Sequence, residues 1–166
     1  TDQVVLTVGY DIDNLTNPDI RRKYKGEVTT DRYGRQVPKH AHGTANLSRP
    51  TSSTRLITEA VMELYDRIVN PNLLIRRLNL TANHVVSEQS AQKKETYEQL
   101  TLFTDYEARE QQRRAEETEL EKEKKMQQAV LDIKKKFGKN AILKGMNFEE
   151  GATTIQRNSQ IGGHRA

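Results

Sequence analysis

The stretch Gln3-Val-Val-Leu-Thr-Val-Gly-Tyr10 decides the fold of this chain. Large apolar side chains recur at every second position, and they are Val4, Leu6, Val8 and Tyr10. The positions between them hold Val5, Thr7 and Gly9. A period of two is the period of a β-strand, because successive side chains of a strand point to opposite faces of the sheet. The stretch therefore predicts a strand with one strongly apolar face.

A second strand is predicted from Lys39 to Leu47. One of its faces carries small or apolar residues, namely Ala41, Gly43, Ala45 and Leu47. The small side chains indicate that another element packs closely over this face. The opposite face carries polar side chains, namely His40, His42, Thr44 and Asn46.

A helix and a third strand complete the predicted order β-β-α-β. The cluster Thr51-Ser-Ser-Thr54 supplies an N-cap, and apolar residues then repeat at helical spacing as far as Val69. Asn70-Pro71 ends the helix. The segment 74–86 alternates again, with leucines expected to face the helix. The predicted fold class is α+β, with a sheet covered by one helix on one face.

The region 11–38 between the first two strands is a polar, turn-rich insertion. Its basic residues include Arg21, Arg22, Lys23 and Lys25. The run Asp31-Arg-Tyr-Gly34 is typical of a hairpin turn, with glycine where a positive φ is needed. We call residues 11–38 the basic insertion.

Composition limits the classes of function. The chain has 166 residues, a net charge of +4 and 34% hydrophobic residues. It contains no cysteine, which excludes disulfides and thiolate metal sites, and no apolar run has the length of about 20 residues that a membrane span needs. The basic balance with few aromatics favours contact with phosphates over base stacking. Since a strand begins almost at Thr1, we expect a fragment of a longer polypeptide.

The sheet face away from the helix is the candidate binding surface. We call it the polar face, and its residues are Thr7, His40, His42, Thr44, Asn46, Arg77, Asn79, Thr81 and Asn83. It holds short hydrogen-bonding groups, imidazoles and one arginine, with no carboxylate. A surface without acidic groups on a basic domain is typical of a face that follows phosphates. The basic insertion would extend it. An ordinary solvated sheet face is the alternative.

Catalytic and metal-binding patterns are weak. His40-x-His42 offers two ligands on one strand face, but no third ligand is evident nearby. Asp11-x-Asp13 is the nearest approach to a two-metal carboxylate site, and the third carboxylate of such a site is missing. We therefore predict no catalytic residue, no metal and no cofactor in this chain.

A short apolar peptide follows the last predicted strand, within a linker at 87–104. It reads Gln99-Leu100-Thr101-Leu102-Phe103 and offers an amide, two aliphatic anchors and an aromatic ring. Apolar and aromatic anchors of this kind supply most of the binding energy of an interface. A turn that closes the preceding domain is the alternative. A long charged helix is predicted at 105–137, and an irregular, flexible tail at 138–166.

These segments together resemble the little-finger domain of Y-family translesion DNA polymerases, in the UmuC-like branch of Gram-positive bacteria. The resemblance rests on Gln3–Tyr10, Val37–Thr44, the helix that begins at 51–54, and Leu74–Thr81. Peptide 99–103 is similar to the family's sliding-clamp motif, and 144–164 to its C-terminal tail. That family's little finger has the order β-α-β-β-α-β, so residues 1–86 would be a partial domain without its first strand and helix.

The resemblance implies a DNA-gripping and clamp-tethering part of a bacterial, nucleoid-associated polymerase. DNA contacts would come from the polar face and the basic insertion, and clamp contacts from Gln99, Leu100, Leu102 and Phe103. The parent's catalytic carboxylates, with their Mg²⁺, would lie in a palm that this chain lacks, so the chain alone would be inactive. A recombinase filament is a further possible partner. The alternative function is a non-enzymatic interaction protein that uses its long charged helix.

Overall fold

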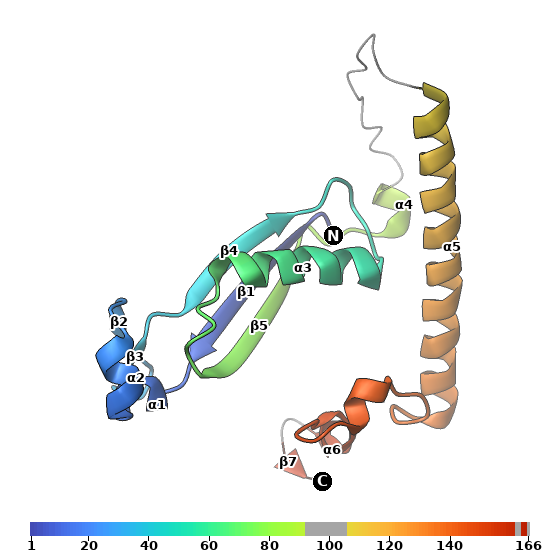
Figure 1. Ribbon diagram of the computed structural model, residues 1–166. Helices are drawn as coiled ribbons and strands as arrows, with labels where there is room; N and C mark the ends of the chain where they lie inside the picture. The colour runs from blue at the N-terminus through green and yellow to red at the C-terminus, as the bar shows by residue number, and fades with distance from the viewer. Residues whose placement is uncertain (92–105, 162–163, 166) are drawn as a thin grey trace. The chain divides into compact units, whose positions relative to one another are not determined.

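A computed structural model of the chain describes residues 1–91, 106–161 and 164–165. The chain divides into two units, Thr1–Gln99 and Leu100–Ala166. The first unit contains the sheet and the basic insertion, and the second contains the long helix and the segment that follows it (Figure 1).

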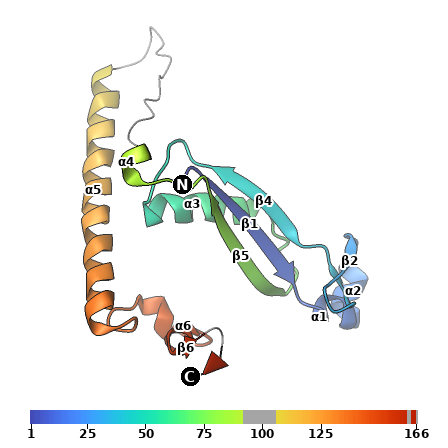
Figure 2. The same cartoon turned by 180° about the vertical axis from the view of Figure 1, so that it is seen from behind.

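The first unit is built on a three-stranded antiparallel sheet in the order β4-β1-β5. Strand β1 (Gln3–Tyr10) lies between β4 (Ala41–Asn46) and β5 (Ile75–Asn83). Helix α3 (Thr54–Ile68) lies across one face of the sheet (Figures 1 and 2). This arrangement confirms the predicted α+β class and the order β-β-α-β of the main elements.

The core lies between β1 and α3. Alternate residues of β1 are buried because they point toward the helix, as the period of two predicts. The buried apolar side chains are Val4, Leu6, Val8, Tyr10, Leu64, Val69 and Leu73. The helix begins where the side chain of Ser53 accepts a hydrogen bond from the backbone N–H of Leu56, at 3.2 Å. The predicted N-cap cluster therefore contains the actual cap.

Gly43 allows the helix to approach β4 closely. A Cβ atom at this position would lie 2.9 Å from Leu64 Cδ1 and 3.2 Å from Ile68 Cγ2. The first distance is shorter than unbonded carbon atoms adopt and the second is tighter than usual, so a side chain at position 43 would force the Leu64 and Ile68 side chains of α3 to shift. The small residues of β4 thus have the packing role that the sequence indicated.

Helix α3 packs against β4 and β1 and leaves the same face of β5 largely uncovered. Leu78 and Leu80 of β5 point to this face, yet 57% and 54% of their surface is exposed. One helix therefore covers only part of the sheet. A single helix beside three strands is consistent with the partial little-finger domain that the resemblance implies.

The basic insertion folds into four short elements at the end of the sheet where β1 stops (Figures 1 and 2). These are α1 (Asp13–Thr16), α2 (Pro18–Lys23), β2 (Val28–Thr30) and β3 (Gln36–Pro38). Strands β2 and β3 pair as an antiparallel hairpin.

Asn14 fixes the insertion to the rest of the first unit. Its side chain is fully buried. The Nδ2 group donates to the backbone carbonyl oxygens of Asp11 and Leu74, both at 2.9 Å, and Oδ1 accepts from the backbone N–H of Leu74 at 2.8 Å. A buried amide with these three hydrogen bonds holds two distant segments in one place.

The chain after β5 contains several short elements and one long helix. They are α4 (Glu88–Ala91), α5 (Tyr106–Phe137), the 3₁₀ helix η1 (Gly145–Phe148), α6 (Thr154–Asn158), and the paired β6 (Gln160–Ile161) and β7 (His164–Arg165). Helix α5 ends before Gly138, which has a φ of 95° and suits a C′ position. In the described part of the chain, no helix is both long and apolar enough to cross a membrane.

Residues after 138 form local structure where the sequence predicted an irregular tail. Asn140 connects two parts of this segment, since its Nδ2 donates to the carbonyl oxygen of Ile155 and its Oδ1 accepts from Asn158 Nδ2. Thr154 Oγ1 donates to Asn147 Oδ1 at 3.1 Å. Side-chain amides thus supply contacts that an apolar periodicity does not reveal.

We expect Gly43→Ala to lower the free energy of unfolding by about 1–3 kcal/mol, the usual effect of adding volume to a packed site. Urea denaturation followed by circular dichroism measures the change. Gly9→Ala is the matched control in the same sheet, because the nearest atom to a Cβ there lies at 3.9 Å. Equal stability of the two variants would contradict the close packing of α3 on β4.

Candidate nucleic-acid interface

The polar face lies on the side of the sheet opposite α3. Register places Thr7 of β1 between His42 of β4 and Asn79 of β5. Val5 lies between Thr44 and Thr81 in the same way. The structure therefore brings the predicted polar residues of all three strands onto one surface. Apart from the partly buried Thr7 and Asn83, these side chains are exposed.

Hydrogen bonds between side chains connect the strands across this face. Thr7 Oγ1 and His42 Nδ1 lie 2.9 Å apart. Toward the start of β1, Gln3 Nε2 donates to Asn46 Oδ1 and Gln3 Oε1 accepts from Asn83 Nδ2, both at 2.8 Å. Gln3 thus belongs to the polar face, although the sequence analysis missed it. The alternating apolar residues, which were the signal used, begin one residue later at Val4.

Arg77 and His40 lie at the end of the polar face nearest the basic insertion. Arg77 is opposite Gly9, and a Cβ at Gly9 would be 3.9 Å from the Arg77 Cβ. His40 precedes β4 by one residue, but its ring meets that of His42 edge-on, with 6.4 Å between centroids. The residues of the polar face include no carboxylate, so its hydroxyl, amide, imidazole and guanidinium donors would face an anionic ligand without repulsion from an acidic side chain. Such donors suit phosphate oxygens.

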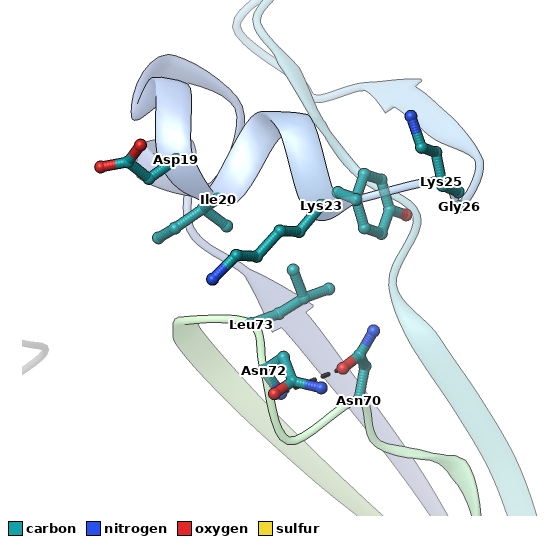
Figure 3. A pocket seen from close by; sticks show the side chains of 9 residues that line it. Asp19, Ile20, Lys23, Lys25, Gly26, Asn70, Asn72 and Leu73 are labelled. Carbon is teal, nitrogen blue, oxygen red and sulfur yellow. Dashed lines mark hydrogen bonds between the residues drawn. The ribbon is translucent and has the colours of Figure 1, made fainter.

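The four predicted cations of the basic insertion do not form one cluster. Arg21, Arg22 and Lys23 occupy the last turn of α2, where positive charge complements the helix dipole. Arg22 pairs with Asp19, and both side chains are largely exposed. Lys23 and Lys25 instead line a pocket (Figure 3). Of the four cations, only Lys23 and Lys25 therefore line the same pocket.

This pocket, of about 590 Å³, lies between α2 and the turn that leads into β5. Its walls are Asp19, Ile20, Lys23, Tyr24, Lys25, Gly26, Asn70, Asn72 and Leu73. The Lys23 side chain extends between α2 and Leu73, and the turn is held by a hydrogen bond from the Asn72 backbone N–H to Asn70 Oδ1 (Figure 3). Tyr24 donates its hydroxyl proton to the carbonyl oxygen of Glu27. Burial raises the pKa of Tyr24, so this phenol remains protonated and is unsuited to act as a base near neutral pH.

The two aspartates considered for metal binding have structural partners. Asp11 Oδ1 accepts from the backbone N–H of Asp13 at 3.0 Å, and Asp11 Oδ2 accepts from Arg76 Nη1 at 3.4 Å. Asp13 Oδ1 accepts from Thr16 Oγ1 at 3.3 Å. These contacts close the turn after β1 and begin α1. Among the described residues, no group of three or more histidine, aspartate or glutamate side chains is placed to hold a metal ion.

Asp31 organises the turn between β2 and β3. Its Oδ1 accepts from the backbone N–H groups of Tyr33 and Arg35, at 2.8 and 3.0 Å, and its Oδ2 accepts from Arg35 Nε at 2.8 Å. Gly34 has a φ of 78°, which confirms the predicted glycine turn. The Arg35 side chain, hydrogen-bonded to the carboxylate, lowers the pKa of Asp31. We call residues 31–35 the hairpin tip.

The predicted clamp-binding residues, Gln99, Leu100, Leu102 and Phe103, lie outside the described residues. Their role therefore stays a prediction from the sequence.

The sheet, its single helix and the polar opposite face define an α+β domain of the little-finger type. Comparison with known protein families matches residues 4–102 to the impB/mucB/samB family C-terminal domain. Because this match spans more than half of the chain, the chain belongs to that family. It is a C-terminal region of a Y-family DNA polymerase, as the resemblance indicated. Comparisons with curated proteins and with solved structures gave no match.

We expect the Asp31 carboxyl to titrate below its ordinary pKa of 3.8. A carboxyl with a lowered pKa in the folded state stabilises the fold above its ordinary pKa, and this contribution is lost as the pH falls through the lowered value. Carboxyl carbon shifts in an NMR titration measure the midpoint, and the amide signals of Tyr33 and Arg35, which donate to this carboxylate, should move with it. In Arg35→Gln the midpoint should rise toward the ordinary value, and a midpoint in the wild type at or above that value would contradict this assignment.

Proposed function

We propose that this chain is the DNA-gripping and clamp-tethering part of a translesion polymerase of the UmuC-like Gram-positive branch. The polar face would contact the backbone of the template–primer duplex without sequence preference. The observation that carries this proposal is a sheet face with Arg77, two histidines and several amides and hydroxyls, and without a carboxylate.

Phosphate contact explains the chemistry of the polar face better than base readout does. Its donors are mostly short side chains fixed on a sheet, and the Thr7–His42 and Gln3–Asn46 hydrogen bonds restrict their motion. Short donors fixed on a sheet match a repeating row of phosphate oxygens, whereas base readout needs a helix or a two-stranded ribbon that enters a groove. DNA affinity from these contacts would be modest and strongly dependent on salt.

Clamp tethering would compensate for this modest affinity. Peptide 99–103 would bind a hydrophobic pocket on the sliding clamp and keep the polar face near DNA. Linking two weak contacts raises the effective concentration of each, so together they hold the protein better than either alone. Damage bypass, association with the nucleoid and binding to a recombinase filament belong to this same proposal for the parent polymerase. Catalysis would come from its palm with Mg²⁺.

We expect Thr81→Glu to weaken duplex DNA binding by about fivefold, because like charges about 4 Å apart in water repel by about 1 kcal/mol. Fluorescence anisotropy across a salt series measures the affinity. Wild-type affinity should fall linearly on a log–log plot, with a slope of about −0.9 per phosphate contact.

Thr58→Glu is the control for this charge change, because Thr58 is an exposed residue of α3 and α3 covers the opposite face of the sheet. It adds the same charge away from the proposed contact and should bind DNA nearly as the wild type does. Equal losses in both variants, or a flat salt dependence of the wild type, would contradict the proposed interface.

For the clamp peptide, we expect the double substitution Leu102→Ala and Phe103→Ala to abolish capture of the chain by a bacterial sliding clamp in a pull-down. The two anchors are the apolar groups that a pocket would bury. DNA binding should be unchanged. Thr101→Ala changes the position between the anchors and should retain clamp binding. Full capture of the double variant would remove the clamp assignment and leave the DNA proposal standing.

A further inference from the structure

The hairpin tip carries an aromatic side chain that the fold does not use. Tyr33 is 79% exposed, which is the highest value among the large hydrophobic residues exposed in the described part of the chain. It is not part of the hydrophobic core, which contains Tyr10 and has Tyr24 and Tyr65 packed against it. An exposed tyrosine contributes little to stability by burial, so its position calls for another explanation.

The tip holds Tyr33 in a fixed position. Asp31 accepts hydrogen bonds from the backbone N–H of Tyr33 and from both the backbone and the side chain of Arg35. Backbone bonds close the same turn, since Gly34 N–H donates to the Asp31 carbonyl at 3.0 Å and Asp31 N–H donates to the Arg35 carbonyl at 2.9 Å. A turn closed by five hydrogen bonds presents its central side chain with little loss of entropy on binding.

Arg35 supports one face of the Tyr33 ring. The guanidinium carbon lies 5.0 Å from the ring centroid, within the range of a cation–π contact. The exposure of Tyr33 shows that the rest of the ring remains open to solvent. The tip therefore offers a flat aromatic surface, backed by a cation and free on its other side.

The charges around this ring select the ligand. Asp31 is neutralised by Arg35, with 2.6 Å between its Oδ2 and the Nη2 of Arg35. Arg32 is exposed and directly precedes Tyr33 in the sequence, so the same tip carries a second positive charge. The tip has no other large apolar side chain to form a protein-docking patch. A flat ring next to a cation matches one nucleotide, whose base stacks and whose phosphate pairs.

We propose that Tyr33 stacks on an unpaired base of single-stranded DNA while Arg32 contacts an adjacent phosphate. This inference rests on the proposed DNA-binding function and extends it from the duplex backbone to an unpaired strand. Asp31 and Arg35 are positioning residues, because they hold the ring and do not touch the base.

The test uses the full chain and two DNAs, a fluorescent oligothymidylate and a blunt duplex, in anisotropy titrations. Tyr33→Ala should bind the single strand at least about fivefold more weakly, since stacking on one base typically accounts for such a loss. Tyr33→Phe keeps the ring and should stay within about twofold of the wild type. Tyr33→Ala should bind the duplex with unchanged affinity, and Arg32→Gln should reduce the slope of the salt dependence.

Phe137→Ala is the matched control in the second unit. Phe137 is also exposed, at 67%, and has the Lys136 ammonium 5.1 Å from its ring centroid. Its loss should leave single-strand affinity unchanged if stacking is specific to the hairpin tip. Photocrosslinking of 5-iodouracil within the oligonucleotide should label Tyr33, and mass spectrometry locates the labelled residue.

The outcomes separate this inference from the function on which it rests. Normal duplex binding, with Tyr33→Ala equal to Tyr33→Phe on the single strand, would overturn the stacking role alone. A crosslink at another residue without one at Tyr33 would do the same. Failure of the wild-type chain to bind either DNA would overturn the proposed function together with the inference. Backbone amide spectra of Tyr33→Ala test whether the hairpin still forms. If it does, a weaker affinity of this variant is due to the loss of the aromatic ring.

Discussion

The alternation of side chains along β1 is the constraint on which the first unit depends. β1 is the central strand. Through the register, the direction of each of its side chains therefore sets the direction of the side chains opposite it on β4 and β5. Leu6 faces the helix only if Thr7 faces away, and the same holds for their partners on β4 and β5. A register shift of one residue would bury the polar residues and expose the core. The polar face is therefore a direct consequence of how the core is packed.

Much of this first unit could be predicted because its determinants are local. The period of two from Val4 to Tyr10, the small residues around Gly43 and the cap at Ser53 each appear within a few residues of sequence. Asn14 could not be predicted as an anchor, because its partner Leu74 lies 60 positions away. Gln3 was missed because its amide matters only once Asn46 and Asn83 are aligned beside it. Long-range hydrogen bonds of this kind leave no periodic signal.

The candidate site divides into two chemically different parts. The polar face is a row of donors on a rigid sheet, whereas the basic insertion offers separate features, namely the Lys23–Lys25 pocket and the hairpin tip. Low aromatic content predicted phosphate contact rather than stacking, and phosphate contact is what we propose for the polar face. Composition averages over the chain, however, and one well-held tyrosine is sufficient for one stacked base. The position and support of an aromatic residue matter more than its frequency.

The way the insertion is anchored connects its features to the sheet. Asn14 ties α1 to Leu74, the residue before β5. The connection between α3 and β5 is also tied to β1, because the Tyr10 hydroxyl accepts from the backbone N–H of Asn70 at 3.0 Å. Both ties involve the turn that forms one wall of the pocket. Loss of Asn14 would leave the backbone N–H of Leu74 without its partner, and an unsatisfied buried group costs about 1–3 kcal/mol. The Leu74 carbonyl oxygen would still accept from the backbone N–H of Asp11 at 2.9 Å. The hairpin tip is held separately, by the hydrogen bonds that the Asp31 carboxylate accepts from Tyr33 and Arg35. Substitution of Asn14 would therefore alter where the tip lies relative to the polar face. Substitution of Asp31 would alter only how the tip holds the Tyr33 ring.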